Sequence, residues 1–102
     1  MESLMAMLEE NPTDSFILYA VAKEHESLNN HENALAYFLQ IKDQDPNYVG
    51  MYYHLGKLYE KLENSDLAIS AYQEGIEIAK NLKDFHALSE LNTAKLNLEM
   101  DL

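Results

Sequence analysis

The sequence predicts an all-α fold in which antiparallel helical hairpins are stacked as repeated units. Three observations support this prediction. The interval from Pro12 to Pro46, the only two prolines, also separates many other pairs of similar residues. Apolar residues within each interval are spaced three and four apart, and a polar cluster divides each interval in two. A period between about 20 and 50 residues is typical of stacked-repeat proteins, in which each unit buries its apolar face against its neighbours.

The interval from Pro12 to Pro46 also separates pairs of identical residues elsewhere in the chain. Shifting the chain by this interval aligns Tyr19 with Tyr53, Lys23 with Lys57, Glu26 with Glu60, Leu28 with Leu62, Asn30 with Asn64, and Ala34 with Ala68. This alignment predicts repeat one at residues 13–46 and repeat two at 47–80. A chain of 102 residues has the size of one domain, so we expect a single domain over 1–102, with a half repeat at 1–12 and a C-terminal capping helix at 84–99.

The first three helices are expected at residues 2–10, 14–28 and 31–43. The first corresponds to the second helix of a hairpin, because its Leu4 and Met7 lie one repeat interval before Phe38 and Ile41. The next helix carries its packing face on Leu18, Val21, Ala22, His25 and Leu28, and the third on Ala34, Leu35, Phe38 and Ile41. Asparagine tolerates left-handed backbone and caps helices, so the cluster Asn29-Asn30-His31 predicts a tight turn between them.

The last three helices are expected at residues 48–62, 65–81 and 84–99. The packing face continues on Tyr52, Leu55, Gly56, Tyr59 and Leu62, and then on Ala68, Ile69, Tyr72 and Gly75. The cluster Glu63-Asn64-Ser65 supplies the turn. Asp84 is suited to cap a final helix in which Ala87, Leu91, Ala94 and Leu98 form an apolar stripe.

Composition and charge exclude several classes of function. Eighteen acidic residues against seven lysines give a formal net charge of −11, which repels phosphate backbones and anionic membrane surfaces. The longest apolar run, residues 16–22, is much shorter than the roughly 20 residues needed to cross a bilayer. The chain has no cysteine, so thiolate nucleophiles and cysteine-bound metals are excluded. We expect an acidic cytoplasmic protein with no nucleic-acid or membrane partner, because its first residues also lack the features of a secretory signal.

The second repeat carries a recognisable signature. Tyr52-x2-Leu55-Gly56-x2-Tyr59 is followed by Ala68-x3-Tyr72, and in the first repeat Ala34-x3-Phe38 precedes Pro46. With this pattern the sequence resembles the tetratricopeptide repeat family, over about two full repeats and their flanking helices. The resemblance implies an α-α superhelix, a solenoid of antiparallel helical hairpins. Lys80 stands where the family has a proline, so the helix expected at 65–81 is not forced to end there.

The resemblance also implies a binding surface. In this family the first helix of each hairpin lines a concave groove that commonly holds a peptide from a partner protein. The residues that correspond to the groove are Phe16, Tyr19, Lys23 and Glu26, and Gly50, Tyr53, Lys57 and Glu60. Each set is spaced i, i+3, i+7, i+10 and therefore follows one helix face. We interpret the repeated tyrosine, lysine and glutamate as a surface that holds an extended peptide, the alternative being surface residues inherited from a duplication.

The sequence therefore predicts a protein–protein interaction adaptor whose partner segment is extended and neutral to basic. Self-association is the alternative. Stacked-repeat proteins usually need about three units with polar ends, whereas segment 2–10 presents Leu4, Met7 and Leu8. Three arrangements would cover these side chains: residues 1–10 fold back as a cap, the chain is a piece of a longer array, or two copies pair through their terminal helices. The last would make the protein a homodimer and a structural assembly element.

Catalysis and cofactor binding are not expected. His25-Glu26 begins like a zinc-protease motif, but Asn29 stands in the place of the second histidine. His54 and His86 have no sequence neighbours at metal-ligand spacing. The three glycines do not form a phosphate-binding loop. We therefore predict that the protein is not an enzyme and uses no metal or cofactor.

Overall fold

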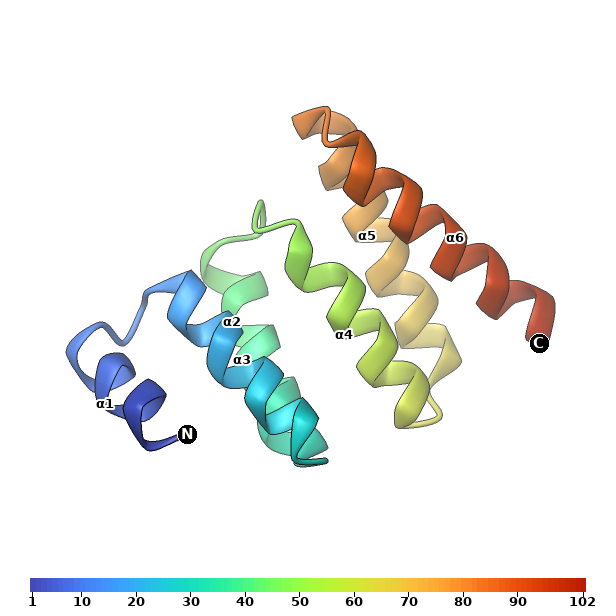
Figure 1. The fold of residues 1–102 in the computed structure, drawn as a ribbon. Coiled ribbons are helices and arrows are strands. Elements are labelled where there is room, and N and C mark those ends of the chain that lie inside the picture. Colours follow the sequence, from blue (N-terminus) through green and yellow to red (C-terminus); the bar gives the residue numbers. More distant parts are fainter. The chain divides into compact units, whose positions relative to one another are not determined.

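The computed structural model describes all 102 residues and contains six α-helices and no strand (Figure 1). The helices are α1 (Glu2–Glu10), α2 (Ser15–Ser27), α3 (His31–Gln44), α4 (Gly50–Lys61), α5 (Ser65–Leu82) and α6 (Phe85–Asp101). Every predicted helix is present, and the ends agree with the predicted ends within two residues. Helix α5 continues past Lys80 to Leu82, as the absence of a proline there allows.

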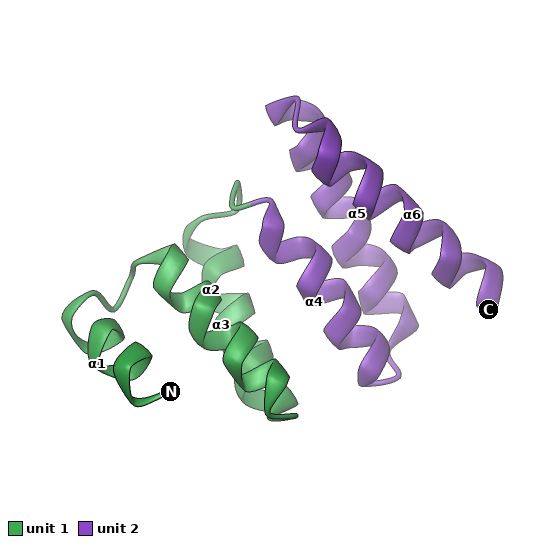
Figure 2. Ribbon diagram, viewed as in Figure 1, with its two compact units in different colours: residues 1–48 green, residues 49–102 purple.

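The chain divides into two compact units, residues 1–48 and 49–102 (Figure 2). The first unit contains α1, α2 and α3, and the second contains α4, α5 and α6. The division falls two residues after the predicted end of repeat one. The organisation into a single domain stays a prediction.

The first unit is built on the hairpin of α2 and α3. Six side chains buried in it come from the predicted packing faces: Leu18, Val21, Ala22, Ala34, Phe38 and Ile41. The hairpin turns at Asn29, whose φ of 61° lies in the left-handed region that asparagine tolerates. At the other end, Nε2 of Gln44 donates a hydrogen bond to the carbonyl oxygen of Thr13 at 2.7 Å. Helix α1 packs against α2 and buries Leu8.

The second unit joins the hairpin of α4 and α5 to α6, which packs on both helices. The helices approach closely at two glycines. A side-chain carbon at Gly56 would overlap the ring of Tyr72, and one at Gly75 would come within 2.6 Å of the Cβ atom of Tyr52. Both tyrosine rings are buried. The expected stripe of α6 is also largely confirmed, because Leu91, Ala94 and Leu98 are the buried residues of that helix.

Side-chain caps fix the starts of three helices. Asp14, Asn64 and Asp84 each accept a hydrogen bond from the backbone N–H three residues later, at 3.1 Å in every case. This is the N-cap geometry that satisfies a free amide at a helix start. Asn30 is equivalent to Asn64 in the repeat but makes no such bond at the start of α3. Its side-chain nitrogen lies 3.4 Å from Nδ1 of His25 instead.

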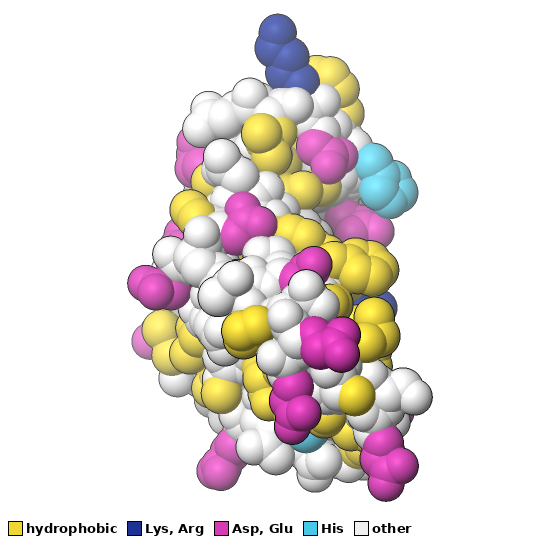
Figure 3. Space-filling model, turned by 90° about the vertical axis from the view of Figure 1, so that its left-hand side faces the viewer, with side chains coloured by type: hydrophobic (Ala, Val, Ile, Leu, Met, Phe, Trp, Pro, Cys, Tyr) yellow, Lys and Arg dark blue, Asp and Glu magenta, His cyan; other side chains and the backbone are white.

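Acidic side chains outnumber basic ones eighteen to seven, and apolar side chains are also exposed. Figure 3 shows acidic side chains spread among apolar ones on one face of the molecule. The most exposed large apolar side chains are Met100 at 74%, Leu102 at 71% and Phe85 at 70%. None of the six helices combines the length and the apolar character that a membrane span requires.

Candidate peptide-binding site

The predicted face of α2 lies within the first unit. Phe16 is exposed, Tyr19 and Glu26 are half-buried, and Lys23 is exposed. The Nζ atom of Lys23 lies 5.6 Å from the centre of the Tyr19 ring, which is cation–π geometry. The same ring contacts Phe38 edge-on, with ring centres 6.3 Å apart. Tyr19 is therefore anchored on the core while the lysine covers its outer side.

Tyr19 also contacts a second aromatic ring. Its ring centre lies 5.4 Å from that of Tyr48, which follows α3. Burial raises the pKa of the Tyr48 phenol, and the nearby carboxylates of Asp14 and Asp45 raise it further. The first unit thus offers a small aromatic cluster with acidic groups beside it.

The predicted face of α4 repeats this arrangement in the second unit. Gly50 is exposed, and Tyr53, Lys57 and Glu60 are half-buried. The Nζ atom of Lys57 lies 5.6 Å from the centre of the Tyr53 ring, which is the distance found between Lys23 and Tyr19. The structure therefore brings the repeated tyrosine and lysine together in both units.

The glutamate of this face has a second role. The carboxylate of Glu60 lies 3.9 Å from Nζ of Lys57 and also accepts a hydrogen bond from the hydroxyl of Tyr72 on α5. Burial, the hydrogen bond to Glu60 and the charge of Glu60 together raise the pKa of Tyr72 well above its usual range. In the first unit the residue equivalent to Tyr72 is Phe38, which has no hydroxyl. The two faces therefore differ in how their glutamates are held.

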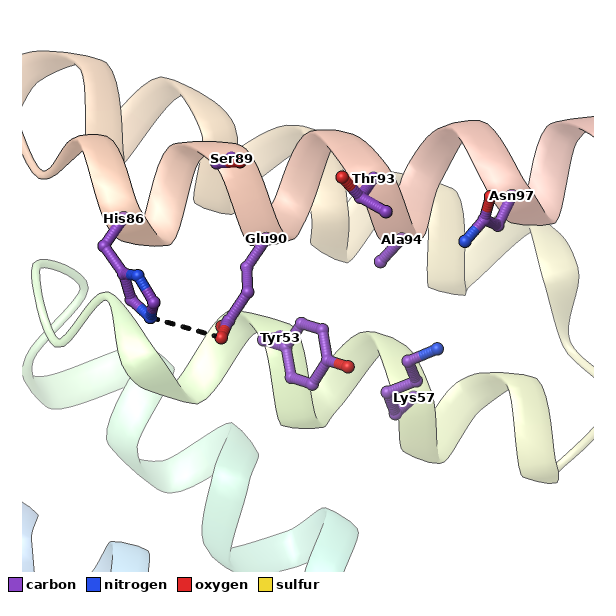
Figure 4. Close-up of a pocket in the computed structure, with 8 residues that line it drawn as sticks. All are labelled: Tyr53, Lys57, His86, Ser89, Glu90, Thr93, Ala94 and Asn97. Carbon is purple, nitrogen blue, oxygen red and sulfur yellow. Dashed lines mark ion pairs between the residues drawn. The ribbon is translucent and has the colours of Figure 1, made fainter.

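An open cleft of about 260 Å³ lies between α4 and α6, within the second unit (Figure 4). Two of its lining residues, Tyr53 and Lys57, belong to the predicted face. The others come from α6: His86, Ser89, Glu90, Thr93, Ala94 and Asn97. These six positions follow the spacing i, i+3, i+4, i+7, i+8 and i+11 of one helix face.

The chemistry of the cleft changes along its length. At one end Nε2 of His86 lies 3.4 Å from a carboxylate oxygen of Glu90. At the other end Lys57 and Asn97 lie toward one another, and the Tyr53 ring lies between the two ends (Figure 4). The cleft thus offers a carboxylate, an aromatic surface and an ammonium group in succession, with hydroxyl groups of Ser89 and Thr93 beside them.

Sequence reasoning missed the α6 side of the cleft. Shifting Tyr53 and Lys57 by one repeat interval lands on Ala87 and Leu91, and Leu91 belongs to the buried stripe. The tyrosine–lysine–glutamate pattern therefore ends after repeat two. The polar residues on α6 have a helical spacing in the sequence. Which helix their side chains face depends on packing, which the spacing does not record.

Two further histidines contact tyrosine rings. The ring of His25 stacks on Tyr37 with centres 5.6 Å apart, and His54 meets Tyr53 edge-on at 5.5 Å. No group of three or more histidine, aspartate or glutamate side chains is placed to hold a metal ion.

Comparison with known families matches two segments of the chain. A sequence model described as Tetratricopeptide repeat matches residues 17–48 and 49–82. The boundary between the two matches coincides with the division between the two compact units.

Two solved structures resemble this chain. The crystal structure of a tetratricopeptide repeat domain protein from Salinibacter ruber is 50% identical, with a TM-score of 0.81, and the match covers 84% of this chain and 96% of that one. The solution structure of a protein from Bordetella parapertussis gives a TM-score of 0.86, with 98% of this chain and 87% of that one covered. The second similarity concerns the fold alone, because only 23% of the residues are identical.

Among curated proteins, the chain is similar to the Photosystem I assembly protein Ycf3 of Synechococcus elongatus. The two are 38% identical over 78 residues. The match takes in 69% of this chain but only 45% of the relative, so the chain spans about half the length of the curated protein.

Proposed function

Because this chain belongs to the tetratricopeptide repeat family, we propose that it is an adaptor that binds an extended segment of a partner protein. The family resemblance and the all-α fold class predicted from the sequence are confirmed. Family membership supports the general role in protein–protein interaction. The finer proposal, binding of an extended segment, is supported above all by the α4–α6 cleft that contains Tyr53 and Lys57.

The side chains of the cleft suit a peptide backbone. Hydroxyl groups and the side-chain amide of Asn97 both donate and accept hydrogen bonds, so they can pair with the N–H and C=O groups of an extended segment. The Tyr53 ring offers a flat surface for the side chains of that segment. The face of α2 supplies a second tyrosine–lysine pair of the same geometry, which we propose also contacts the partner.

The net charge of the chain limits which partner segments can bind. The net charge of −11 repels strongly acidic proteins, so the segment is proposed to be neutral to basic overall. The similarity to an assembly protein supports a role in bringing other proteins together. We propose that the protein has no catalytic activity and binds no cofactor.

The experiment that tests this proposal combines the two tyrosine positions. The variant with both Tyr19→Ala and Tyr53→Ala should capture less partner from cells by crosslinking through Lys23 and Lys57, while its helix content, measured by circular dichroism, stays unchanged. Tyr59→Ala removes a half-exposed tyrosine of α4 outside the cleft and serves as the matched control. Unchanged capture by the folded double variant contradicts the proposal.

Self-association is a second candidate, favoured by apolar side chains on the terminal helices. Met7 of α1 is 46% exposed, and Phe85 and Met100 of α6 are more exposed still. The molecular mass in solution, measured against concentration, tests this candidate. A dimer that dissociates when Leu4 and Met7 are changed to polar residues supports terminal pairing, and a monomer at all concentrations excludes it.

A further inference from the structure

We propose that the α4–α6 cleft selects a segment that carries a cationic side chain and a carboxylate side chain three residues apart. The inference rests on the proposed function and specifies the ligand of the same cleft. It follows from the separation of opposite charges along the cleft, where Glu90 stands at one end and Lys57 with Asn97 at the other (Figure 4).

The Glu90 end is suited to a cationic side chain. The side chain of Glu90 is 50% exposed, and its ion-pair partner is His86, which carries charge only when it is protonated. A neutral imidazole leaves the charge of the carboxylate uncompensated. An incoming lysine or arginine can therefore pair with Glu90, and the hydroxyl of Ser89 lines the same cleft.

The other end is suited to a carboxylate. Lys57 has 40% of its side chain exposed, and its contact with Glu60 is long at 3.9 Å. An ammonium group has three donors, so Lys57 retains donors for a ligand oxygen while it lies over the Tyr53 ring. The amide of Asn97 can donate a second hydrogen bond to the same carboxylate.

The spacing follows from the geometry of α6. Between Glu90 and Asn97 the helix makes about two turns, which separates the two residues by about 10 Å along its axis. In a polyproline II segment, side chains three residues apart lie on the same side and are separated by about 9 Å. The backbone of the two residues between the charges then lies over the Tyr53 ring and Ala94 while their side chains point to the other two sides, so proline, which favours this conformation, suits both positions.

Blocked synthetic peptides test this inference on the 102-residue chain. The probe is Gly-Lys-Pro-Pro-Glu-Gly. The matched control is Gly-Lys-Glu-Pro-Pro-Gly, which has the same composition with the charges adjacent, and two further peptides carry lysine or glutamate at both charged positions. Binding is followed by shifts of the backbone amide signals in NMR titrations at about 0.15 M salt, which limits long-range attraction to the acidic protein.

The probe should bind about 1.4-fold to fivefold more tightly than its composition control, because an exposed ion pair contributes about 0.2–1 kcal/mol. The amides of Tyr53, Glu90 and Asn97 should shift on binding. In Glu90→Lys the ranking should change, and the peptide with two glutamates should bind more tightly than the probe. Glu99→Lys is the control variant, because Glu99 lies on the same helix, is 45% exposed and pairs with Lys95 in a comparable i,i+4 contact outside the cleft.

The proposed selection of opposite charges three residues apart, here called the charge-spacing rule, is overturned if all four peptides bind equally. It is also overturned if Glu90→Lys and Glu99→Lys alter the ranking equally. Either result leaves the adaptor proposal standing. Absence of any shift in the cleft overturns the rule as well. The adaptor proposal is decided separately, by capture of the natural partner with the double tyrosine variant.

Discussion

The hydroxyl of Tyr72 donates a hydrogen bond to the carboxylate of Glu60, and that carboxylate also pairs with Lys57 in the α4–α6 cleft. Tyr72 is a core residue whose ring covers Gly56. A single glutamate therefore connects the packing of the α4–α5 hairpin to the position of a lysine proposed to bind the partner. The first unit has no equivalent connection through Phe38, which lacks a hydroxyl.

Tyr72→Phe should lower the free energy of unfolding by about 1–2 kcal/mol. The substitution keeps the ring over Gly56 but removes a hydrogen bond to a charged acceptor, and such bonds contribute about 1.5–3 kcal/mol. Part of the loss is recovered because Glu60 is partly exposed and can bond to water. Urea unfolding provides the measurement, with Tyr59→Phe as the control. An equal effect of the two substitutions would show that the bond contributes nothing specific.

Alkaline pH should destabilise the protein through the same tyrosine. The pKa of Tyr72 is raised in the folded protein, whereas a tyrosine in the unfolded chain releases its proton near pH 10. The stabilisation is therefore complete below about pH 10 and is lost above it, because the unfolded chain then binds fewer protons than the folded one. The loss for one such group approaches about 1.4 kcal/mol per pH unit.

The measurement for this prediction is urea unfolding at pH 9, 10 and 11. Tyr48 contributes a change of the same sign, since its pKa is also raised. Tyr72→Phe should therefore reduce the alkaline loss without abolishing it. A loss of the same size in the variant and in the parent protein would exclude Tyr72 as its source.

Gly56→Ala should destabilise the protein by about 1–3 kcal/mol, the usual range for an overpacked core. The new methyl group would overlap the ring of Tyr72, which is fully buried and cannot move outward without disturbing its bond to Glu60. Gly50→Ala is the control, because Gly50 is exposed at the start of α4 and none of the three glycines has a positive φ. Thermal unfolding of both variants gives the comparison. Helix propensity favours alanine over glycine, so a loss at Gly56 alone identifies the overlap, and an unchanged or higher stability of Gly56→Ala contradicts it.

Two asparagines at equivalent positions of the repeat should respond differently to alanine. Asn64→Ala should cost about 1 kcal/mol, because it removes the side-chain cap of α5. Asn30→Ala should cost only a few tenths, because Asn30 makes no side-chain cap bond at the start of α3. Chemical denaturation of the two single variants checks this difference. A larger effect at Asn30 would contradict the cap assignment.

The helices could be predicted closely because their signals are local. Apolar spacing, the two polar clusters and the capping residues lie within a few positions of the structures that they determine, so each helix end was placed within two residues. The left-handed residue Asn29 falls in a predicted turn for the same reason. The repeat interval then supplied the pairing of helices into hairpins.

The candidate site could be predicted only in part. Tyr53 and Lys57 were identified from the repeat, but the α6 residues that complete the cleft lie opposite them through packing that no local pattern records. The sequence also could not predict which neighbouring group each polar side chain contacts. Asn30 and Asn64 occupy the same position of the repeat, yet one lies beside His25 and the other caps a helix. Likewise, the bond from Tyr72 to Glu60 joins residues on different helices and reflects close packing at Gly56.

Because Glu60 contacts both Lys57 and Tyr72, the fluorescence of Tyr72 should depend on the state of the cleft. If a ligand carboxylate pairs with Lys57 as proposed, the charge of Glu60 is less compensated and its hydrogen bond from the Tyr72 hydroxyl should strengthen. The chain contains no tryptophan, so tyrosine emission is not obscured by a stronger fluorophore. Because the chain has seven tyrosines and Tyr53 lies in the cleft itself, the difference in emission between the parent protein and Tyr72→Phe isolates the contribution of the buried ring.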